Sequence, residues 1–196
     1  MKSKEIKAKK IVPGHVYGVT QMKFNDKYLS QLLSTIELIR RGDVNGAALS
    51  NAQFGWQSSG LPMNGVFIPF LQSIDEQCFK FCKSIKKLKF SKIIIDNFWA
   101  NINYENDINW PHRHQGDLSG VFYVQTQSNS GDLVLENFNF DVNNKLSLHL
   151  NTEATVSVQP KKNKLVLFDA NLTHYVTKNL SKNPRISISF NARVCE

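Results

Sequence analysis

The pattern of hydrophobic and polar positions divides the chain into a helical first half and a strand-rich second half. From Asn25 or Asp26, either of which can cap a helix, apolar residues recur at helical spacing until a basic pair and Gly42 end the pattern. A second helical pattern runs from about Phe70 to Leu88. Between the two helices, residues 50–62 (SNAQFGWQSSGLP) are polar and irregular, which indicates either a loop or a wall of a substrate site.

From Lys92 onward the pattern is typical of strands. Segments rich in β-branched and aromatic residues follow one another at short intervals, with Asn, Gly, Asp or Pro between them: SKIIIDNFWANINYEN, SGVFYVQT, DLVLENF, KLSLHL, ATVSVQP, KLVLFDA, HYVTK and RISISFNARV. Such a series predicts an all-β sandwich or barrel. Because 196 residues suit one core and no repeat or linker interrupts them, we expect a single domain over 1–196, with helical support over 25–90 and a β-core over 92–195.

The composition and the cysteines indicate the cellular compartment. Hydrophobic residues make up 41% and charged residues 20% of the chain, as in ordinary globular proteins. No stretch approaches the length of a membrane helix, and the basic start is followed by no apolar block. Cys78 and Cys82 lie one helical turn apart in an apolar pattern, which suits buried thiols better than a disulfide. We therefore expect a cytoplasmic protein without membrane contact.

The formal net charge of +8 raises the question of nucleic-acid binding. Most of the basic residues are lysines, gathered in a leading tail, in residues 80–92 and in residues 161–164. Base-edge recognition commonly depends on bidentate arginine contacts. A solvated lysine-rich surface is therefore favoured over a nucleic-acid site, and an anionic substrate is a third interpretation.

Three of the five histidines occupy positions that suit metal binding. His112 and His114 are two residues apart, so on a strand their side chains point to the same face and can share one ion. His174 follows 62 positions after His112, several strands later. Imidazoles with open coordination positions suit iron, although zinc, copper and nickel also accept them. Taken alone, the His-x-His pair is equally typical of surface or core histidines. His15, near the basic tail, and His149, within a predicted strand, are placed outside the site.

A second feature follows His174 by eleven positions. Arg185 and Ser187 alternate onto one face of an otherwise apolar strand. An arginine that points into a core needs an anion, and it can hold a carboxylate in bidentate fashion while the serine adds a hydroxyl donor. The alternative is that Arg185 faces solvent or pairs with Asp169 or Glu136.

Four ordered motifs together resemble the iron(II)/2-oxoglutarate-dependent oxygenase superfamily, most closely a branch found in marine bacteria and their phages. The motifs are HRHQGDLSGVFYV, GDLVLENF, PKKNKLVLFDANLTHYV and RISISFN, and the similarity covers about Ile93 to Val194. SNAQFGWQS near position 50 resembles the upstream segment of the branch. The resemblance implies a mainly β fold, the double-stranded β-helix or jelly roll, with the N-terminal helices packed against the sheet.

The resemblance also implies roles for individual residues. His112, His114 and His174 match the iron-binding positions, and Arg185 matches the basic residue that binds the remote carboxylate of 2-oxoglutarate, with Ser187 beside it. Contacts with the other end of this cosubstrate fall to Tyr123, or to Asn101 and Asn103. The implied reaction oxidises, typically hydroxylates, a substrate at Fe(II) while 2-oxoglutarate is converted to succinate and CO2.

The chain departs from the superfamily at the second iron ligand. Where the general pattern has a carboxylate, this chain has His114, a spelling that fits the branch it resembles. The set of three histidines is favoured, and a set in which Asp117 replaces His114 is the alternative. Asp169 is a further candidate, although its place suits a strand end or a supporting role better.

Two other functions stay open at this stage. One is a non-catalytic β-sandwich that binds a metal or another ligand, and the other is a three-histidine dioxygenase of the cupin type without 2-oxoglutarate. Both leave Arg185 without a ligand to hold, so they rank below the 2-oxoglutarate enzyme. We expect a small-molecule or peptidyl substrate, and a homodimer through a sheet edge or the apolar helices stays open.

Overall fold

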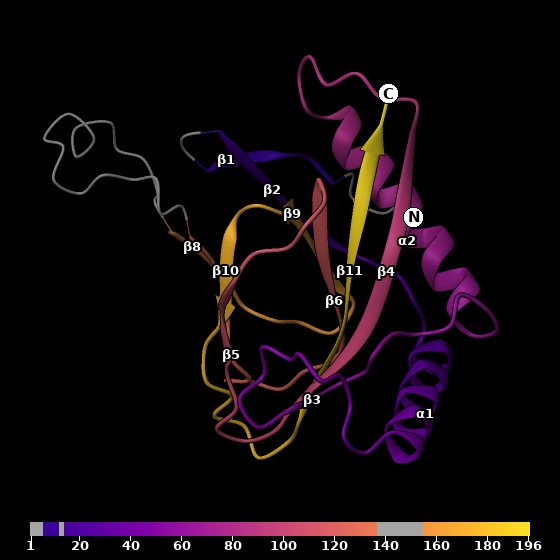
Figure 1. Cartoon of the computed structure of the whole chain (residues 1–196), viewed down its shortest axis with the longest axis vertical. Helices are drawn as coiled ribbons and strands as arrows, with labels where there is room; N and C mark the ends of the chain where they lie inside the picture. The colour runs from indigo at the N-terminus through magenta and orange to yellow at the C-terminus, as the bar shows by residue number, and fades with distance from the viewer. Residues whose placement is uncertain (1–5, 12–13, 137–154) are drawn as a thin grey trace, which may run out of the picture.

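The computed structural model describes residues 6–11, 14–136 and 155–196. Two antiparallel sheets face each other, and two helices lie on the outer side of the larger sheet (Figure 1). This is the mainly β fold with supporting helices that the sequence predicts. In the described part of the chain, neither helix has the length and apolar character needed to cross a lipid bilayer.

Among the described residues, the larger sheet has seven strands and the smaller has four. The larger sheet runs in the order β1 (Lys9–Ile11), β2 (His15–Gln21), β9 (Lys164–Asp169), β6 (Leu118–Gln125), β11 (Arg185–Cys195), β4 (Lys92–Asn103), β3 (Trp56–Gln57). The smaller sheet runs in the order β5 (Asn109–His112), β10 (Thr173–Val176), β7 (Leu133–Glu136), β8 (Thr155–Val158). Strands that are distant in sequence are neighbours in both sheets, so residues from distant parts of the described chain meet between them.

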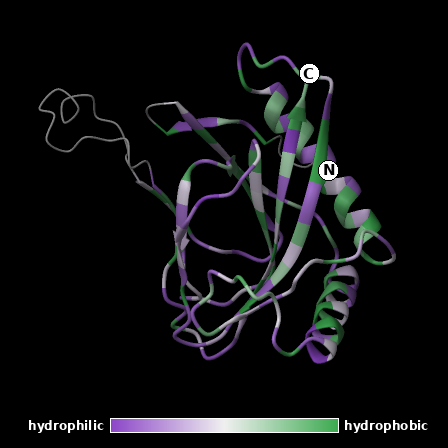
Figure 2. Ribbon diagram, in the orientation of Figure 1, coloured by the Kyte–Doolittle hydropathy of each residue, from purple (hydrophilic) through white to green (hydrophobic). Residues whose placement is uncertain are grey.

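The first helix, α1 (Asp26–Gly42), lies where the sequence predicts it. The Asn25 side chain accepts a hydrogen bond from the Tyr28 backbone N–H at 2.9 Å and so caps the first turn. Leu29, Leu32 and Ile36 form its buried face. Hydrophobic and hydrophilic residues alternate along both helices (Figure 2), as expected for helices that cover a sheet.

The second helix, α2 (Phe67–Lys83), begins and ends earlier than the predicted range of 70–88. It begins ahead of the prediction because Pro69 fits the first turn of a helix, where its missing N–H is not needed. It ends early because the Ser84 hydroxyl donates to the Phe81 carbonyl, and Lys87 adopts a positive φ of 69°. Cys78 and Cys82 are buried free thiols, which confirms that part of the prediction.

Three short strands were not predicted. β1, β2 and β3 lie at the margins of the larger sheet. The segment expected to be a basic tail is therefore part of the folded domain from Ile6 to Ile11 and from His15 onward. β2 is stabilised by its pairing with β9, a partner about 150 residues away that no local pattern reveals. The predicted strand KLSLHL, which contains His149, lies outside the described residues.

Two hydrophobic cores occupy opposite sides of the larger sheet. The first joins the helices to its outer face and includes Leu32, Phe70, Phe122 and Phe190. The second lies between the two sheets and includes residues from both, listed here in chain order: Ile11, Tyr123, Leu133, Leu135, Val158, Val166, Phe168 and Leu172. The space between the sheets is only partly filled by this second core, and the remainder is the pocket described below.

A candidate metal and anion site

A pocket opens between the two sheets, lined by strands of both. The larger sheet contributes side chains from β4, β6, β9 and β11, and the smaller sheet from β5, β7 and β10. The cavity volume is about 80 Å³, several times the roughly 10–15 Å³ that one enclosed water molecule needs. Gly120 on β6 makes room for the Phe190 ring in the core on the helix side of the sheet, because a Cβ there would lie 2.2 Å from that ring. Apart from histidines, Arg185 is the one charged side chain among the described lining residues.

The three predicted histidines meet at one end of this pocket. Their nearest nitrogen atoms all lie within 4.8 Å of one another. His112 and His174 are direct cross-strand partners on β5 and β10, with ring centroids 4.2 Å apart. His114 lies in the chain just after β5, and its ring centroid is 4.9 Å from each of the other two. Three imidazoles from two neighbouring strands therefore converge on one point.

Backbone carbonyls orient two of these rings. Nδ1 of His112 lies 2.6 Å from the Trp110 carbonyl oxygen, and Nδ1 of His174 lies 2.9 Å from the Leu172 carbonyl oxygen. A carbonyl can only accept, so each Nδ1 carries the proton and each Nε2 keeps its lone pair. Metal-binding histidines are commonly held in one tautomer in this way.

The surroundings also keep the imidazoles neutral. Burial lowers the pKa of His174 to about 3 and the pKa of His114 to about 4, and the pKa of His112 is lowered by the same cause. Mutual repulsion between the rings lowers the pKa of His114 and His174 further. Neutral, convergent nitrogen donors fit a divalent transition metal.

The two acidic alternatives lie elsewhere. The Asp117 carboxylate accepts a hydrogen bond from the Val194 backbone N–H at 2.8 Å and lines a different cavity, beside α2. Oδ2 of Asp169 lies 2.6 Å from Nδ1 of His15, at the start of β2. Neither carboxylate belongs to the group of convergent ligands among the described residues, so the geometry favours His114 over Asp117. His15, expected beside a tail, instead lies on β2 and contacts Asp169.

Arg185 lies in the same pocket and is almost completely buried, with 2% of its surface exposed. Its two terminal nitrogens donate to the backbone carbonyls of Ser130 and Gly131 and to the side-chain carbonyls of Asn103 and Asn109. All four acceptors are neutral. Among the described residues, no carboxylate lies within the 4.0 Å of an ion pair, and Nε has no hydrogen-bond partner.

This environment excludes the alternatives weighed for Arg185. It neither faces solvent nor pairs with Asp169 or Glu136. Burial lowers its pKa from the ordinary arginine value, while the nearby Tyr123, Asp107 and Asp132 act in the opposite direction. A buried guanidinium without an anionic partner is costly. It therefore indicates a site for an anion.

The remaining predicted residues surround Arg185. Ser187 lies two residues along β11, opposite Tyr123 of β6 on one side and Asn101 of β4 on the other, and all three line the pocket. Burial raises the pKa of Tyr123 to about 12, so its hydroxyl stays protonated. Asn103 also lines the pocket, but both ends of its amide are hydrogen-bonded to protein groups. A supporting role suits Asn103 better than direct contact with a ligand.

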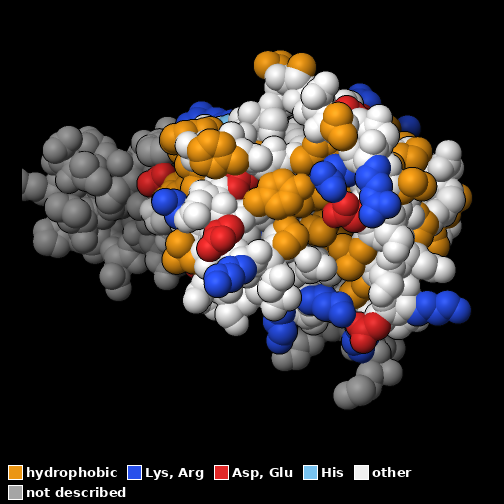
Figure 3. Space-filling view, turned by 90° about the horizontal axis from the view of Figure 1, so that it is seen from below, with side chains coloured by type: hydrophobic (Ala, Val, Ile, Leu, Met, Phe, Trp, Pro, Cys, Tyr) orange, Lys and Arg blue, Asp and Glu red, His pale blue; other side chains and the backbone are white. Residues whose placement is uncertain are grey.

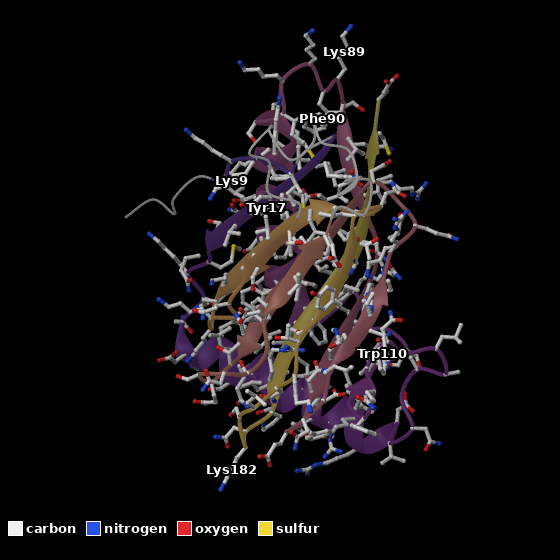
Figure 4. All side chains as sticks on the ribbon, turned by 90° about the vertical axis from the view of Figure 1, so that its left-hand side faces the viewer. Lys9, Tyr17, Lys89, Phe90, Trp110 and Lys182 are labelled. Atoms are coloured by element: carbon white, nitrogen blue, oxygen red, sulfur yellow. The ribbon has the colours of Figure 1, made fainter. Side chains whose placement is uncertain are left out.

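The irregular segment 50–62, interpreted from the sequence as a loop or a wall of a substrate site, contributes Asn51 and Gln57 to the pocket and is therefore both. Trp56 of that segment is buried and donates from Nε1 to the Asp43 carbonyl at 2.7 Å. Trp99 lies next to His114, with ring centroids 5.5 Å apart. Trp110, by contrast, lies at the molecular surface with 52% of it exposed (Figure 4).

Comparison with known proteins supports this geometry. Residues 97–191, just under half of the chain, match the model of the family described as "Putative 2OG-Fe(II) oxygenase". This region contains the three histidines, Arg185 and Ser187. No protein among the curated sequences matches the chain.

Solved structures of low sequence identity share the fold. A prolyl-4-hydroxylase from Pseudomonas putida is 13% identical, with a TM-score of 0.62 over 92% of this chain and 94% of that one. A viral collagen prolyl hydroxylase from Paramecium Bursaria Chlorella virus-1, solved as a 2-oxoglutarate complex, is 15% identical, with a TM-score of 0.60 over 91% and 96%. HygX from Streptomyces hygroscopicus, with nickel, 2-oxoglutarate and hygromycin B bound, is 10% identical, with a TM-score of 0.63 over 91% and 82%.

Proposed function

Because residues 97–191 match the model of a 2-oxoglutarate/Fe(II) oxygenase family, we propose that the chain is a member of the iron(II)/2-oxoglutarate-dependent oxygenase superfamily. The pocket between its sheets would oxidise an organic substrate and convert 2-oxoglutarate to succinate and CO2. One observation carries the proposal. A buried guanidinium without an anionic partner, that of Arg185, lies in the same pocket as three convergent neutral imidazoles.

His112, His114 and His174 would hold the Fe(II) ion, His112 and His174 through the Nε2 atoms that their backbone hydrogen bonds leave free. The bound ion would supply the oxidising chemistry, and the chain would orient the reactants and exclude water. Arg185 would bind the distal carboxylate of 2-oxoglutarate, where its unpartnered Nε offers one more donor. Ser187 and Tyr123 are cross-strand partners that both line the pocket, and their hydroxyls would serve as further donors.

The charge of the pocket supports a dianionic cosubstrate. Most members of this superfamily have a carboxylate among the ligands, whereas the proposed set here is neutral. A divalent ion and Arg185 would then place three positive charges in a pocket whose described lining contains no acidic side chain. The two carboxylates of 2-oxoglutarate would offset two of these charges. A three-histidine dioxygenase without 2-oxoglutarate would leave Arg185 uncompensated.

The substrate side of the pocket is polar and neutral. Asn51, Gln57, Trp99 and Asn101 line the pocket and would form this side, which suits a neutral hydrogen-bonding group of a peptide or a small molecule. The titles of the similar structures include both kinds of ligand, a peptide fragment and hygromycin B. Basic and acidic side chains are interspersed on the face shown in Figure 3, which gives no support there to a continuous nucleic-acid surface.

The proposal is tested by adding Fe(II) and 2-oxoglutarate under anaerobic conditions. The expected result is a weak visible charge-transfer band, followed by succinate release when oxygen and candidate substrates are added. His174→Ala should lose the band because iron no longer binds, and Arg185→Leu should need far more 2-oxoglutarate to reach it.

The matched control is Arg193→Gln, which changes an exposed arginine on the same strand, and it should behave as the wild type. Absence of the band together with absence of succinate would refute the enzyme and leave a binding protein. A band that needs no more 2-oxoglutarate in Arg185→Leu than in the wild type would refute the role of Arg185.

A further inference from the structure

A buried carboxylate lies behind Arg185, outside the set of predicted site residues. Asp107 is completely buried, in the turn between β4 and β5. One oxygen, Oδ1, accepts from the Phe54 backbone N–H at 2.8 Å, and the other, Oδ2, accepts from the Asn103 side-chain amide at 2.6 Å. It makes no ion pair with any described residue. Such a charge is expensive to bury, so its role needs an explanation.

Asn103 connects this carboxylate to Arg185. Its Nδ2 donates to Asp107 Oδ2 at 2.6 Å and to Asn109 Oδ1 at 2.9 Å, and its Oδ1 accepts from Arg185 Nη2 at 2.7 Å. An ionised carboxylate can only accept. The Asn103 amide must therefore point its NH2 group toward Asp107 and its carbonyl oxygen toward Arg185. Asp107 and Arg185 thus require the same orientation of the amide, with its carbonyl oxygen toward the guanidinium.

The same carboxylate also holds the wall of the pocket. Asp107 accepts from the Phe54 N–H and also lies against the backbone of Gly55. A Cβ on Gly55 would lie 2.2 Å from Asp107 Oδ2, so the close approach of these two residues requires glycine. Next to these residues, Ala52 bridges to Asn109, and Gln57 of β3 lines the pocket. Asp107 therefore contacts, on one side, the residue that orients Arg185 and, on the other, the segment that forms the substrate wall.

We propose that Asp107 is a positioning residue for cosubstrate recognition, which acts through the Asn103 amide to hold the Arg185 guanidinium in the orientation that binds a distal carboxylate. The inference rests on the proposed function of Arg185 as the anchor for 2-oxoglutarate. The indirect arrangement has a physical advantage. A carboxylate in direct contact with Arg185 would compete with the cosubstrate, whereas one placed behind an amide orients the guanidinium and leaves it free to bind.

Substitution of Asp107 by asparagine changes only the pattern of donors and acceptors. Asparagine offers one acceptor where two N–H groups, those of Phe54 and Asn103, need one each. If the new amide keeps its bond with the Phe54 N–H, its NH2 group faces Asn103, and the Asn103 amide must turn over. The turned amide would present its NH2 group to Arg185 Nη2, two donors would face each other, and the guanidinium would move.

The test compares two 2-oxoacids that differ in the distal carboxylate. 2-Oxoglutarate and 2-oxobutyrate are titrated anaerobically into Fe(II)-loaded protein, and the dissociation constants are measured by calorimetry. For Asp107→Asn we expect the dissociation constant of 2-oxoglutarate to rise about tenfold, while that of 2-oxobutyrate and the affinity for Fe(II) stay within twofold of the wild type. The matched control is Asp132→Asn. Asp132 also raises the pKa of Arg185, but its carboxylate accepts a hydrogen bond from the Ser157 hydroxyl and not from Asn103. It should leave both constants within twofold.

Two results would overturn the inference. One is an unchanged constant for 2-oxoglutarate in Asp107→Asn, and the other is an equal loss for both acids, which would indicate general damage to the pocket. If Asp107→Asn does not fold, Asn103→Ser replaces it, since serine is too short to connect Asp107 with Arg185, and the same selective loss is expected. A wild-type protein that does not distinguish the two acids would instead refute the proposed function of Arg185.

Discussion

The unfolding free energy of the metal-free protein should fall steeply between pH 6.5 and pH 5, because protons then bind the three histidines in the unfolded chain but not in the folded protein. In the folded state the pKa of His174 is about 3 and that of His114 about 4, whereas both are near 6.5 in the unfolded chain. A lowered folded pKa means that the unfolded state binds the proton first. The stabilisation is therefore complete above pH 6.5, falls as the pH drops below 6.5, and stops falling near the folded pKa.

The size of this loss follows from the interval between the unfolded pKa of about 6.5 and the pH of the measurement. Each histidine contributes about 1.4 kcal/mol per pH unit in this window. At pH 5 the two histidines together would remove about 4 kcal/mol of unfolding free energy relative to pH 8, and His112 adds a loss of the same sign. Since small proteins have a stability of about 5–15 kcal/mol, this loss would be a large fraction of the total.

Urea unfolding with a chelator present, at intervals from pH 8 to pH 5, measures this loss. The decisive comparison is with His174→Gln. The slope of its unfolding free energy against pH should be smaller than that of the wild type by about 1.4 kcal/mol per pH unit. Gly120→Ala provides a control, since it is destabilised by overpacking but keeps all three histidines and should retain the wild-type slope. Equal slopes for the wild type and His174→Gln would refute the reasoning that burial keeps this imidazole neutral.

Three further predictions concern the site and its frame. His114→Ala should abolish Fe(II) binding in an equilibrium titration. Asp117→Ala should leave the dissociation constant of Fe(II) within about twofold of the wild type, because the Asp117 carboxylate lies in another cavity. The opposite result would replace His114 by Asp117 in the proposed ligand set. Ser187→Ala should raise the dissociation constant of 2-oxoglutarate about threefold to tenfold, the value of one hydrogen bond, and an unchanged constant would remove the hydroxyl from the site. Gly120→Ala should lower the unfolding free energy by about 1–3 kcal/mol through overpacking, while Gly60→Ala, with no atom within 4 Å of the added Cβ, should not lower it, as urea unfolding would show.

The sequence predicts those parts of the fold whose signal is local. Helix α1 carries its own cap at Asn25 and its own apolar face, and both its ends were predicted. Helix α2 has a weaker signal at its ends, and both were misplaced. The margins of the larger sheet were missed because β2 and β3 are stabilised by partners far along the chain. Such pairing is invisible to a periodic pattern.

The candidate site divides in the same way. The three histidines and Arg185 stand in motifs whose residue types and spacing indicate chemistry, and the structure brings them into one pocket. Asp107 has no such motif. Its relation to Arg185 exists only because β4 and β11 are neighbours and because a turn returns the chain behind Asn103. Supporting residues of this kind follow from tertiary structure alone.

The direct pairing of His112 with His174 has a consequence for how this chain can change in evolution and in engineering. Side chains alternate along a strand, so inserting or deleting one residue within β5 or β10 would turn a histidine to the opposite face of the smaller sheet. Substitutions in these two strands can therefore be sampled one at a time, whereas changes of length cannot. Loops between strands carry no such constraint, and libraries intended to alter substrate choice should vary loop length and keep both strands at their present length.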